Sequence, residues 1–346
     1  FVTDAIRKRC ENEVLGYTGK PDSYYNAIIN WVKQRYDLIV TKEVINFVPG
    51  IVPGIGMAMN CFTQKGDKVM IQPPVYHPFA WVTTRNERTL VINPLRWENG
   101  MYRMDLDAFR EQIKGCKLFI LCNPHNPGGV VWTEAELRAI ADICYDEKVL
   151  VFSDEIHADL TLPPHTHRPF ATVSEKARMN SVTFMSPSKA FNMPGLSASH
   201  ALIFNEDLRK RFRIYMDAGE LDMGHVFAFL SVEAAYSHGT EWLDQCLAYI
   251  QGNIDFVDEF LKKHAPKIKA IRPEASYLVW LDCRELELSQ KDLNEFFVDK
   301  AHLALNDGEM FGKEGIGFMR LNVASPRCII EKAMKQLADA YQLYIK

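Results

Sequence analysis

The sequence lacks the features that mark membrane-spanning and nucleic-acid-binding proteins. No apolar run reaches the roughly 20 residues that a transmembrane helix requires. The 346 residues carry 40 Lys and Arg against 44 Asp and Glu, which gives a net charge of -4. Since there is no basic surplus to attract phosphate backbones or anionic lipids, we expect neither nucleic acid nor a membrane as a partner.

The sequence also lacks paired or regularly spaced cysteines. Its eight cysteines are scattered, and none forms a C-x-x-C pair or a zinc-binding spacing. Several lie within apolar runs such as KLFILCNP. This pattern indicates reduced core residues in a cytoplasmic protein without a metal site. The chain begins at Phe1 rather than Met, and we expect that an N-terminal segment precedes it.

The apolar segments that are present predict an α/β fold. Hydrophobic residues make up 47% and charged residues 24%, a balance typical of a globular protein with one large domain or two. Apolar strands alternate with helices, which indicates a mixed, mostly parallel sheet covered by helices on both faces. We expect strands over 44–49, 67–74, 89–95, 117–124, 149–155, 181–187 and 199–205. We expect helices over 23–36, 53–63, 105–113 and 133–148.

The pattern changes after about residue 205. Long helical stretches continue to about 265, and the rest mixes short strands with helices. We therefore predict a large domain over 22–250 and a smaller α+β domain made of 1–21 and 251–346. The helical stretch near 240–265 is expected to bridge the two domains.

Unusual polar residues follow four of the predicted strands. The segments after these strands read GIVPGIG, NPHNPGG, DEIHAD and SPSKAFN. In open α/β sheets, ligands bind beyond the carboxyl ends of the strands. The convergence of these four segments predicts a binding site there.

The lysine in SPSKAFN suggests the chemistry of that site. Lys189 at the end of a buried strand could hold an aldehyde as a Schiff base, and pyridoxal phosphate is the aldehyde most often held in this way. Asp154 could keep the pyridine nitrogen protonated, Asn126 could donate to the ring oxygen, and Tyr76 could stack on the ring. His157 could face the ring oxygen or the substrate. Each residue taken alone also has a structural interpretation: a solvent-facing lysine, a helix-capping or ion-paired acid, a turn asparagine, a core aromatic or a structural histidine.

A phosphate and a carboxylate site can also be proposed from the residues. Gly50 precedes a helical run whose first N–H groups could bind phosphate, and the hydroxyls of Ser186 and Ser188 could assist. Arg320 follows an apolar run in the smaller domain and suits a substrate carboxylate. Arg327 is a rival by position, and a surface salt bridge is the alternative for Arg320.

The motifs together resemble a known family. The segments GYTGKPDSYYNAIINW, NPHNPGG, SDEIHADL, SPSKAFNMPGL and RLNVASPR, in this order and spacing, are similar to those of fold-type I pyridoxal-phosphate enzymes of the class I/II aminotransferase family. Within that family they most resemble the cystathionine β-lyase (carbon–sulfur lyase) branch of the MalY/PatB type. The resemblance covers nearly the whole chain.

The resemblance implies further roles. The backbone at Ile51 and Val52, with Ser186, would hold the cofactor phosphate. Members of the family are homodimers with shared sites, which implies that Tyr17 reaches into the neighbour's site. Lys189 and Tyr17 are then the expected catalytic residues. The resemblance also supports the assignments of the other cofactor and substrate residues given above.

Two departures from the family pattern bear on the reaction. Many aminotransferases of the family have Tyr where this chain has His157, and Arg where it has Ser197. Both departures favour a lyase that cleaves L-cystathionine or L-cysteine by α,β-elimination to pyruvate, ammonia and a thiol, with Lys189 as the base. An aminotransferase that passes the amino group to a 2-oxo acid is the alternative. A third possibility is a cofactor-binding regulator that acts through a partner protein.

Overall fold

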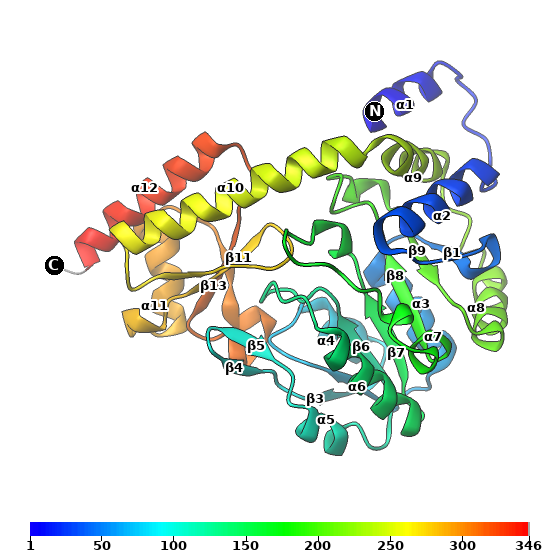
Figure 1. The fold of residues 1–346 in the computed structure, drawn as a ribbon, viewed down its shortest axis with the longest axis horizontal. Helices are drawn as coiled ribbons and strands as arrows, with labels where there is room; N and C mark the ends of the chain where they lie inside the picture. Colours follow the sequence, from blue (N-terminus) through cyan, green and yellow to red (C-terminus); the bar gives the residue numbers. More distant parts are fainter. Residues whose placement is uncertain (345–346) are drawn as a thin grey trace.

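A computed structural model describes residues 1–344. The protein is organised around a seven-stranded sheet (Figure 1). The strand order is β1-β9-β8-β7-β6-β2-β3. The strands from β8 to β3 run parallel, whereas β9 is antiparallel to β8 and β1, so the predicted mixed, mostly parallel sheet is confirmed. The seven strands are β1 (Ile45–Val48), β2 (Lys68–Ile71), β3 (Thr89–Ile92), β6 (Cys116–Cys122), β7 (Leu150–Asp154), β8 (Ser181–Met185) and β9 (Ser199–Leu202).

Both faces of this sheet are buried, because successive side chains of a strand point to opposite faces. On β6, Leu118 and Ile120 join one hydrophobic core, and Phe119 and Leu121 join another. The first core lies under α3 (Ile51–Phe62), α4 (Pro78–Arg85) and α8 (Glu206–Ala218). The second lies under α5 (Leu106–Gln112), α6 (Glu134–Asp146) and α7 (Glu175–Met179). The β1 end is covered by α2 (Asp22–Tyr36) and α9 (Val226–His238).

One hairpin was not predicted, although its turn is visible in the sequence. The strands β4 (Arg96–Glu98) and β5 (Met101–Arg103) pair antiparallel around Asn99 and Gly100. These two residues have φ values of 51° and 80°, which is the left-handed backbone that two-residue hairpin turns require. An Asn-Gly pair between short alternating segments is the usual signal for such a turn.

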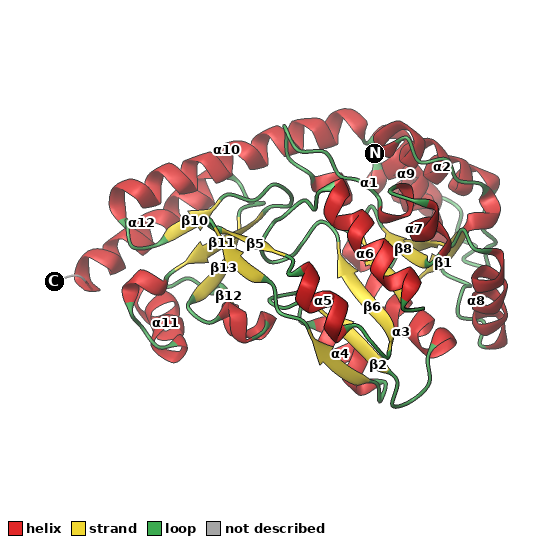
Figure 2. Cartoon of the chain, turned by 60° about the horizontal axis from the view of Figure 1, so that its bottom comes forward, coloured by secondary structure: helices red, strands yellow, loops and turns green. Residues whose placement is uncertain are grey.

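A second, four-stranded antiparallel sheet forms the other part of the molecule (Figure 2). Its order is β10-β11-β13-β12, which agrees with the predicted α+β character of the C-terminal region. Its strands are β10 (Lys269–Ile271), β11 (Leu278–Asp282), β12 (Asn306–Asp307) and β13 (Phe318–Asn322). The helices of this region are α11 (Gln290–Glu295), followed by a π-helical turn over Phe296–Lys300, and α12 (Arg327–Tyr344).

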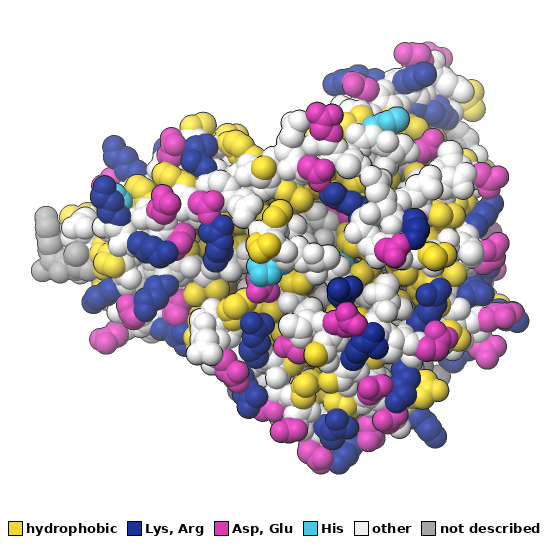
Figure 3. All heavy atoms as spheres, viewed as in Figure 1, with side chains coloured by type: hydrophobic (Ala, Val, Ile, Leu, Met, Phe, Trp, Pro, Cys, Tyr) yellow, Lys and Arg dark blue, Asp and Glu magenta, His cyan; other side chains and the backbone are white. Residues whose placement is uncertain are grey.

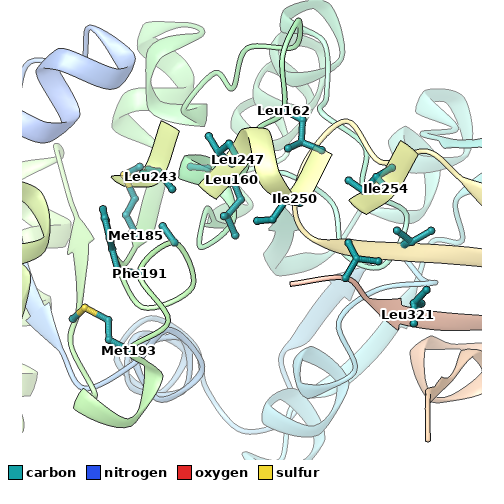
Figure 4. Close-up of a cluster of buried hydrophobic side chains, with 14 of the residues drawn as sticks. Leu160, Leu162, Met185, Phe191, Met193, Leu243, Leu247, Ile250, Ile254 and Leu321 are labelled. Carbon is teal, nitrogen blue, oxygen red and sulfur yellow. The ribbon is translucent and has the colours of Figure 1, made fainter. Parts of the chain in front are cut away.

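The long helix α10 (Thr240–His264) connects the two parts, as expected for the stretch near 240–265. Its buried apolar residues recur every three or four positions and form one stripe. In Figure 4, Leu243 lies near Met185 of β8 in the larger sheet, and Ile254 lies toward Leu321 of the smaller one. All of these side chains belong to a single core, so α10 packs against both sheets.

The first helix lies against the larger part of the molecule. Helix α1 (Val2–Cys10) contacts α9, and the ring of Phe1 meets the rings of Phe191 and Trp242 edge-on at 6.0 and 6.3 Å. This placement differs from the predicted assignment of residues 1–21 to the smaller domain. The predicted boundary at residue 250 falls within α10, and we retain it as a proposal.

The surface carries charges of both signs. Figure 3 shows acidic and basic side chains interspersed over the visible face. Within residues 1–344, no helix combines the length and the apolar character needed to cross a membrane. The eight cysteines are free thiols, and no metal-binding group of His, Cys, Asp or Glu is found in the same range.

Candidate active site

A cavity of about 450 Å³ lies at the carboxyl ends of β6, β7 and β8 and is closed by β11 and β13 of the second sheet. Its size suits a small-molecule site. Eight of the ten predicted site residues line it: Ile51, Val52, Tyr76, Asn126, Asp154, His157, Lys189 and Arg320. The exceptions are Ser186 and Tyr17. Polar residues from separate strand ends thus converge as the sequence predicted.

Lys189 and Asp154 reach the cavity from neighbouring strands. Lys189 follows β8, and the loop that carries it is fixed by Phe191 and Met193, which are buried in the core under α10 (Figure 4). Asp154 ends β7 and is only 4% exposed. Burial raises the pKa of Asp154 to about 7, although the Ile156 N–H that donates to its Oδ1 at 3.1 Å opposes this shift. A cationic partner in the cavity would stabilise its ionised form.

Asn126 and Arg320 form a pair that joins the two sheets. Arg320 Nη1 donates to Asn126 Oδ1 at 2.8 Å across 194 residues of sequence. Because a guanidinium only donates, the amide oxygen of Asn126 must face Arg320. The amide NH₂ of Asn126 is therefore available to donate to a ligand in the cavity.

The guanidinium of Arg320 is held on several sides. Nη2 donates to Asn306 Oδ1 at 2.8 Å, and the group lies 4.6 Å from the centroid of the Phe311 ring. Burial lowers the pKa of Arg320 to about 10, so the side chain stays cationic near neutral pH. Its rival Arg327 lies outside the cavity wall and donates from Nε to Asn253 Oδ1 at 2.8 Å. Arg320 is thus the residue placed to bind an anion.

The N-terminus of α3 forms one end of the cavity. Gly50 precedes the helix with φ +134°, a backbone conformation that side-chain-bearing residues rarely adopt. The first helical bond runs from Gly54 N–H to Gly50 O at 2.9 Å. The N–H groups of Ile51 and Val52 therefore lie in the first turn, where helices leave donors free for an anion.

The serines near Lys189 have separate positions. Ser188 lines the cavity, but Ser186 does not. The hydroxyl of Ser186 donates to Ala198 O at 2.7 Å and accepts from Ser188 N–H at 3.1 Å. As placed, its proton is used within the protein, so phosphate binding by Ser186 stays a prediction. Ser197 also lines the cavity.

Two ring side chains complete the wall near Lys189. Burial and the nearby charge of Asp154 raise the pKa of Tyr76. Burial, together with the cations Lys189 and Arg320, lowers the pKa of His157 to about 3. His157 is thus neutral near neutral pH, and its buried Nδ1 has no partner within residues 1–344.

Tyr17 lies outside the cavity of its own chain. Its side chain is 96% exposed and borders a surface hollow formed by 15–20 and 222–227. It does not line the cavity. A role for Tyr17 in catalysis would therefore require contact with another subunit.

Several residues of the cavity wall were not predicted from the sequence. His77 follows the predicted residue Tyr76, which was the available signal for it, and Ser199 lies two positions after Ser197. Tyr277 and Asn322 come from the ends of β11 and β13. Asn322 lies in the segment RLNVASPR, two positions after Arg320, whereas no local pattern marks Tyr277, which only the packing of the second sheet on the first brings to the site.

The cavity fits pyridoxal phosphate by its donors and acceptors. Buried polar groups normally have hydrogen-bond partners, but His157 Nδ1, His77 Nδ1 and Arg320 Nε have none among the described residues. Free N–H groups at α3 suit a phosphate, the amide of Asn126 suits a ring oxygen, and Asp154 suits a protonated ring nitrogen. Lys189 is the amine that could condense with the aldehyde.

These features define a class: a lysine-centred cofactor site at the strand ends of an α/β sheet, with a second sheet that contributes an arginine to the same cavity. The chain belongs to the aminotransferase class I and II family, whose family model matches residues 4–337. It is 37% identical over 341 residues to cystathionine β-lyase PatB of Bacillus subtilis, which covers 98% of this chain and 88% of that protein.

Solved structures give the same result. Cystalysin from Treponema denticola, which contains a pyridoxal 5'-phosphate cofactor, superposes with a TM-score of 0.96 and 34% identity over 100% of this chain and 88% of its own. The PLP-bound C–S lyase from Staphylococcus hominis gives a TM-score of 0.91 and 33% identity over 98% of this chain and 87% of its own. The predicted family is therefore confirmed.

Proposed function

We propose that this protein is a pyridoxal-phosphate-dependent carbon–sulfur β-lyase. It cleaves sulfur amino acids such as L-cystathionine or L-cysteine by α,β-elimination; with L-cysteine, water is consumed and pyruvate, ammonia and hydrogen sulfide are released. The observation that carries the proposal is the convergence of Lys189, Asp154, Asn126 and Arg320 on one cavity. The names of its relatives, PatB and the C–S lyase of Staphylococcus hominis, support the lyase reaction.

The cofactor supplies an aldehyde that condenses with amines and a protonated ring that withdraws electrons from the substrate Cα. Asp154 would keep a proton on the ring nitrogen, because burial disfavours its carboxylate and a cationic neighbour stabilises it. The N–H groups of Ile51 and Val52 would bind the phosphate of the cofactor, and the NH₂ of Asn126 would donate to its ring oxygen.

The remaining residues act on the substrate. Arg320 binds its α-carboxylate and thereby fixes the orientation of the Cα–H bond. Lys189, once its amine is free, takes the proton from Cα as a general base. His157 stays neutral because it is buried, and it can accept or donate a hydrogen bond without adding charge. The electron pair left at Cα would then form a Cα–Cβ double bond as the C–S bond breaks and its electron pair leaves with the thiolate.

Two residues favour elimination over transamination. His157 and Ser197 stand where many aminotransferases of the family have Tyr and Arg, and both line the cavity. The core residues Lys189, Asp154 and Arg320 would serve either reaction. An aminotransferase is therefore the alternative that the experiment must separate.

We also propose a cytoplasmic homodimer. Tyr17 is exposed together with Val14 and Leu15, at 96%, 70% and 65%, and such a cluster of apolar side chains suits a subunit contact. In a dimer of this kind Tyr17 would reach the partner's cavity. The free cysteines support a reducing compartment.

The test is an assay of the pyridoxal-phosphate-loaded protein with L-cystathionine or L-cysteine and no 2-oxo acid. Pyruvate and thiol or sulfide should form together, and Lys189→Ala should abolish both. If turnover requires both an amino donor and 2-oxoglutarate, the protein is an aminotransferase and the interpretation of His157 and Ser197 is wrong.

A further inference from the structure

The acidic and histidine side chains at the end of β7 and in the turn after it face two sides, the cavity and the rest of the fold. Asp154 and His157 line the cavity. Glu155 and Asp159 are equally buried but lie outside the cavity wall, where each binds another part of the fold. This division suggests that the second pair holds the first in place.

Glu155 has an unusually complete set of partners. Its side chain is 0% exposed. Oε1 accepts from Ser153 Oγ at 2.7 Å and from Phe170 N–H at 2.8 Å, and Oε2 lies 2.9 Å from His167 Nε2. These bonds join the strand β7, the turn and the segment 167–170. The side chain thus fixes the backbone that carries Asp154.

Hydrogen bonding alone does not explain why this residue is an acid. A glutamine could accept from Ser153 and Phe170 N–H with its oxygen and donate to His167 with its NH₂. The chain instead places a second carboxylate directly after the buried Asp154. Burying two adjacent carboxylates is costly, so the charge of Glu155 requires an explanation.

We propose that Glu155 is a positioning residue for the reaction: it fixes the turn that presents Asp154, and its negative charge behind Asp154 favours a protonated ring nitrogen in the bound cofactor. This inference rests on the proposed cofactor function. Burial is the main cause of the raised pKa of Asp154, and the neighbouring carboxylate of Glu155 acts in the same direction. The same charge acts on any cation that Asp154 binds.

The groups that face this pair come from several elements. Lys189 after β8, Cys122 on β6 and Tyr76 before α4 are coupled to Asp154. His167 faces Glu155, and the Tyr36 ring of α2 meets the His167 ring edge-on at 5.5 Å.

Asp159 provides a matched control. It is a buried carboxylate of the same turn, it accepts from Trp31 Nε1 at 2.9 Å and from the Tyr36 hydroxyl, and it is not among the groups that shift the pKa of Asp154. Asp159→Asn therefore perturbs the anchoring of the turn without removing the charge next to Asp154.

The experiment compares Glu155→Gln, Glu155→Asp and Asp159→Asn. Pyridoxal phosphate is titrated into each apoprotein, and the visible absorbance of the lysine-bound cofactor is then followed against pH. Glu155→Gln should weaken cofactor binding by about tenfold and lower the midpoint of the pH titration by about half a unit or more, because a nearby negative charge is lost. Asp159→Asn should leave the midpoint within about 0.2 units of the wild type.

The variant Glu155→Asp separates the effect of the negative charge from the effect of the side-chain length. Glu155→Asp keeps the charge but is too short to keep all three contacts, so its melting temperature should fall while the midpoint stays close to that of the wild type. An unchanged midpoint in Glu155→Gln, or equal shifts in Glu155→Gln and Asp159→Asn, would overturn the inference. If the wild-type protein itself does not bind pyridoxal phosphate, the proposed function fails instead.

Discussion

The seven-stranded sheet presents its site residues from loops beyond its strand ends, whereas the four-stranded sheet presents Arg320 from the middle of a strand. Asn126, Asp154 and Lys189 follow or end β6, β7 and β8. Arg320 lies within β13, opposite Trp280 on β11 and Asn306 on β12. The parallel sheet thus holds the proposed cofactor contacts, and the antiparallel sheet supplies the proposed substrate contact.

Because of this difference, the two sheets should contribute separately to cofactor binding and to substrate binding. Contacts within the larger sheet are fixed by the cores that pack on its two faces, so they suit a cofactor that stays bound. The contact from the smaller sheet depends on how the two sheets are joined through α10 and through the Asn126–Arg320 bond. Substitutions should therefore affect the cofactor or the substrate according to the sheet they come from.

The largest effect on turnover and cofactor binding is expected for substitution of Lys189, which the larger sheet contributes. Lys189→Ala should remove the visible absorbance of the bound cofactor and lower kcat by at least about 10³-fold, because both the condensing amine and the general base are lost. Absorbance spectra and the pyruvate assay measure the two effects. Lys176→Ala on the exposed face of α7 is the control for folding. Substantial turnover in Lys189→Ala would exclude the assigned mechanism.

Asp154→Asn should lower kcat by about 10²- to 10³-fold and weaken cofactor binding, because the ring nitrogen loses its charged partner. In the apoprotein, by contrast, the same substitution should raise the free energy of unfolding at high pH. The pKa of this carboxyl rises from 3.8 unfolded to about 7 folded. Folding thus favours its protonated form, and the stability that Asp154 contributes is complete below pH 3.8 and is lost as the pH rises through 7.

At pH 8 apo Asp154→Asn should therefore be more stable than the apo wild type, by at most about 4 kcal/mol. At pH 4 the two should differ much less. Urea unfolding of the apoproteins at both pH values measures this difference. A wild-type advantage at pH 8 would show that the buried carboxylate is compensated without the cofactor.

Arg320→Lys tests the other sheet. It should lower kcat/KM by about 10- to 100-fold, because a lysine cannot make the paired hydrogen bonds of a guanidinium to a carboxylate. Cofactor affinity and absorbance should change little. Arg327→Lys, the matched variant of the arginine outside the cavity, should change neither quantity. A large loss of cofactor affinity in Arg320→Lys would show that the smaller sheet also contributes to cofactor binding.

The smallest effect on turnover is expected within α10. Ile254 is 1% exposed and packs where the helix meets the smaller sheet (Figure 4). Ile254→Ala should lower the free energy of unfolding by about 2–5 kcal/mol, and Ile254→Val by about 0.5–1.5 kcal/mol. Any change in activity should be seen in KM rather than in cofactor affinity. Chemical unfolding and steady-state kinetics together test this, and a selective loss of cofactor binding would contradict it.

Much of the site was predictable because its residues follow local patterns. Apolar runs such as that of β6 determined a sheet buried on both faces, and polar segments after the strands located Lys189, Asp154 and Asn126 at one edge. The helix expected over 133–148 begins where Thr133 and Glu136 form a capping box, a pattern of residues three positions apart. These features depend only on neighbours within a few residues, so the sequence by itself carries them.

Only the tertiary structure decided which distant groups meet. It brought Tyr277 to the cavity, paired Arg320 with Asn126, and turned the Ser186 hydroxyl toward Ala198. It also placed α1 on α9 and Glu155 against His167. Such contacts depend on how two sheets and their covering helices pack, and side chains far apart in sequence leave no local signal of that packing.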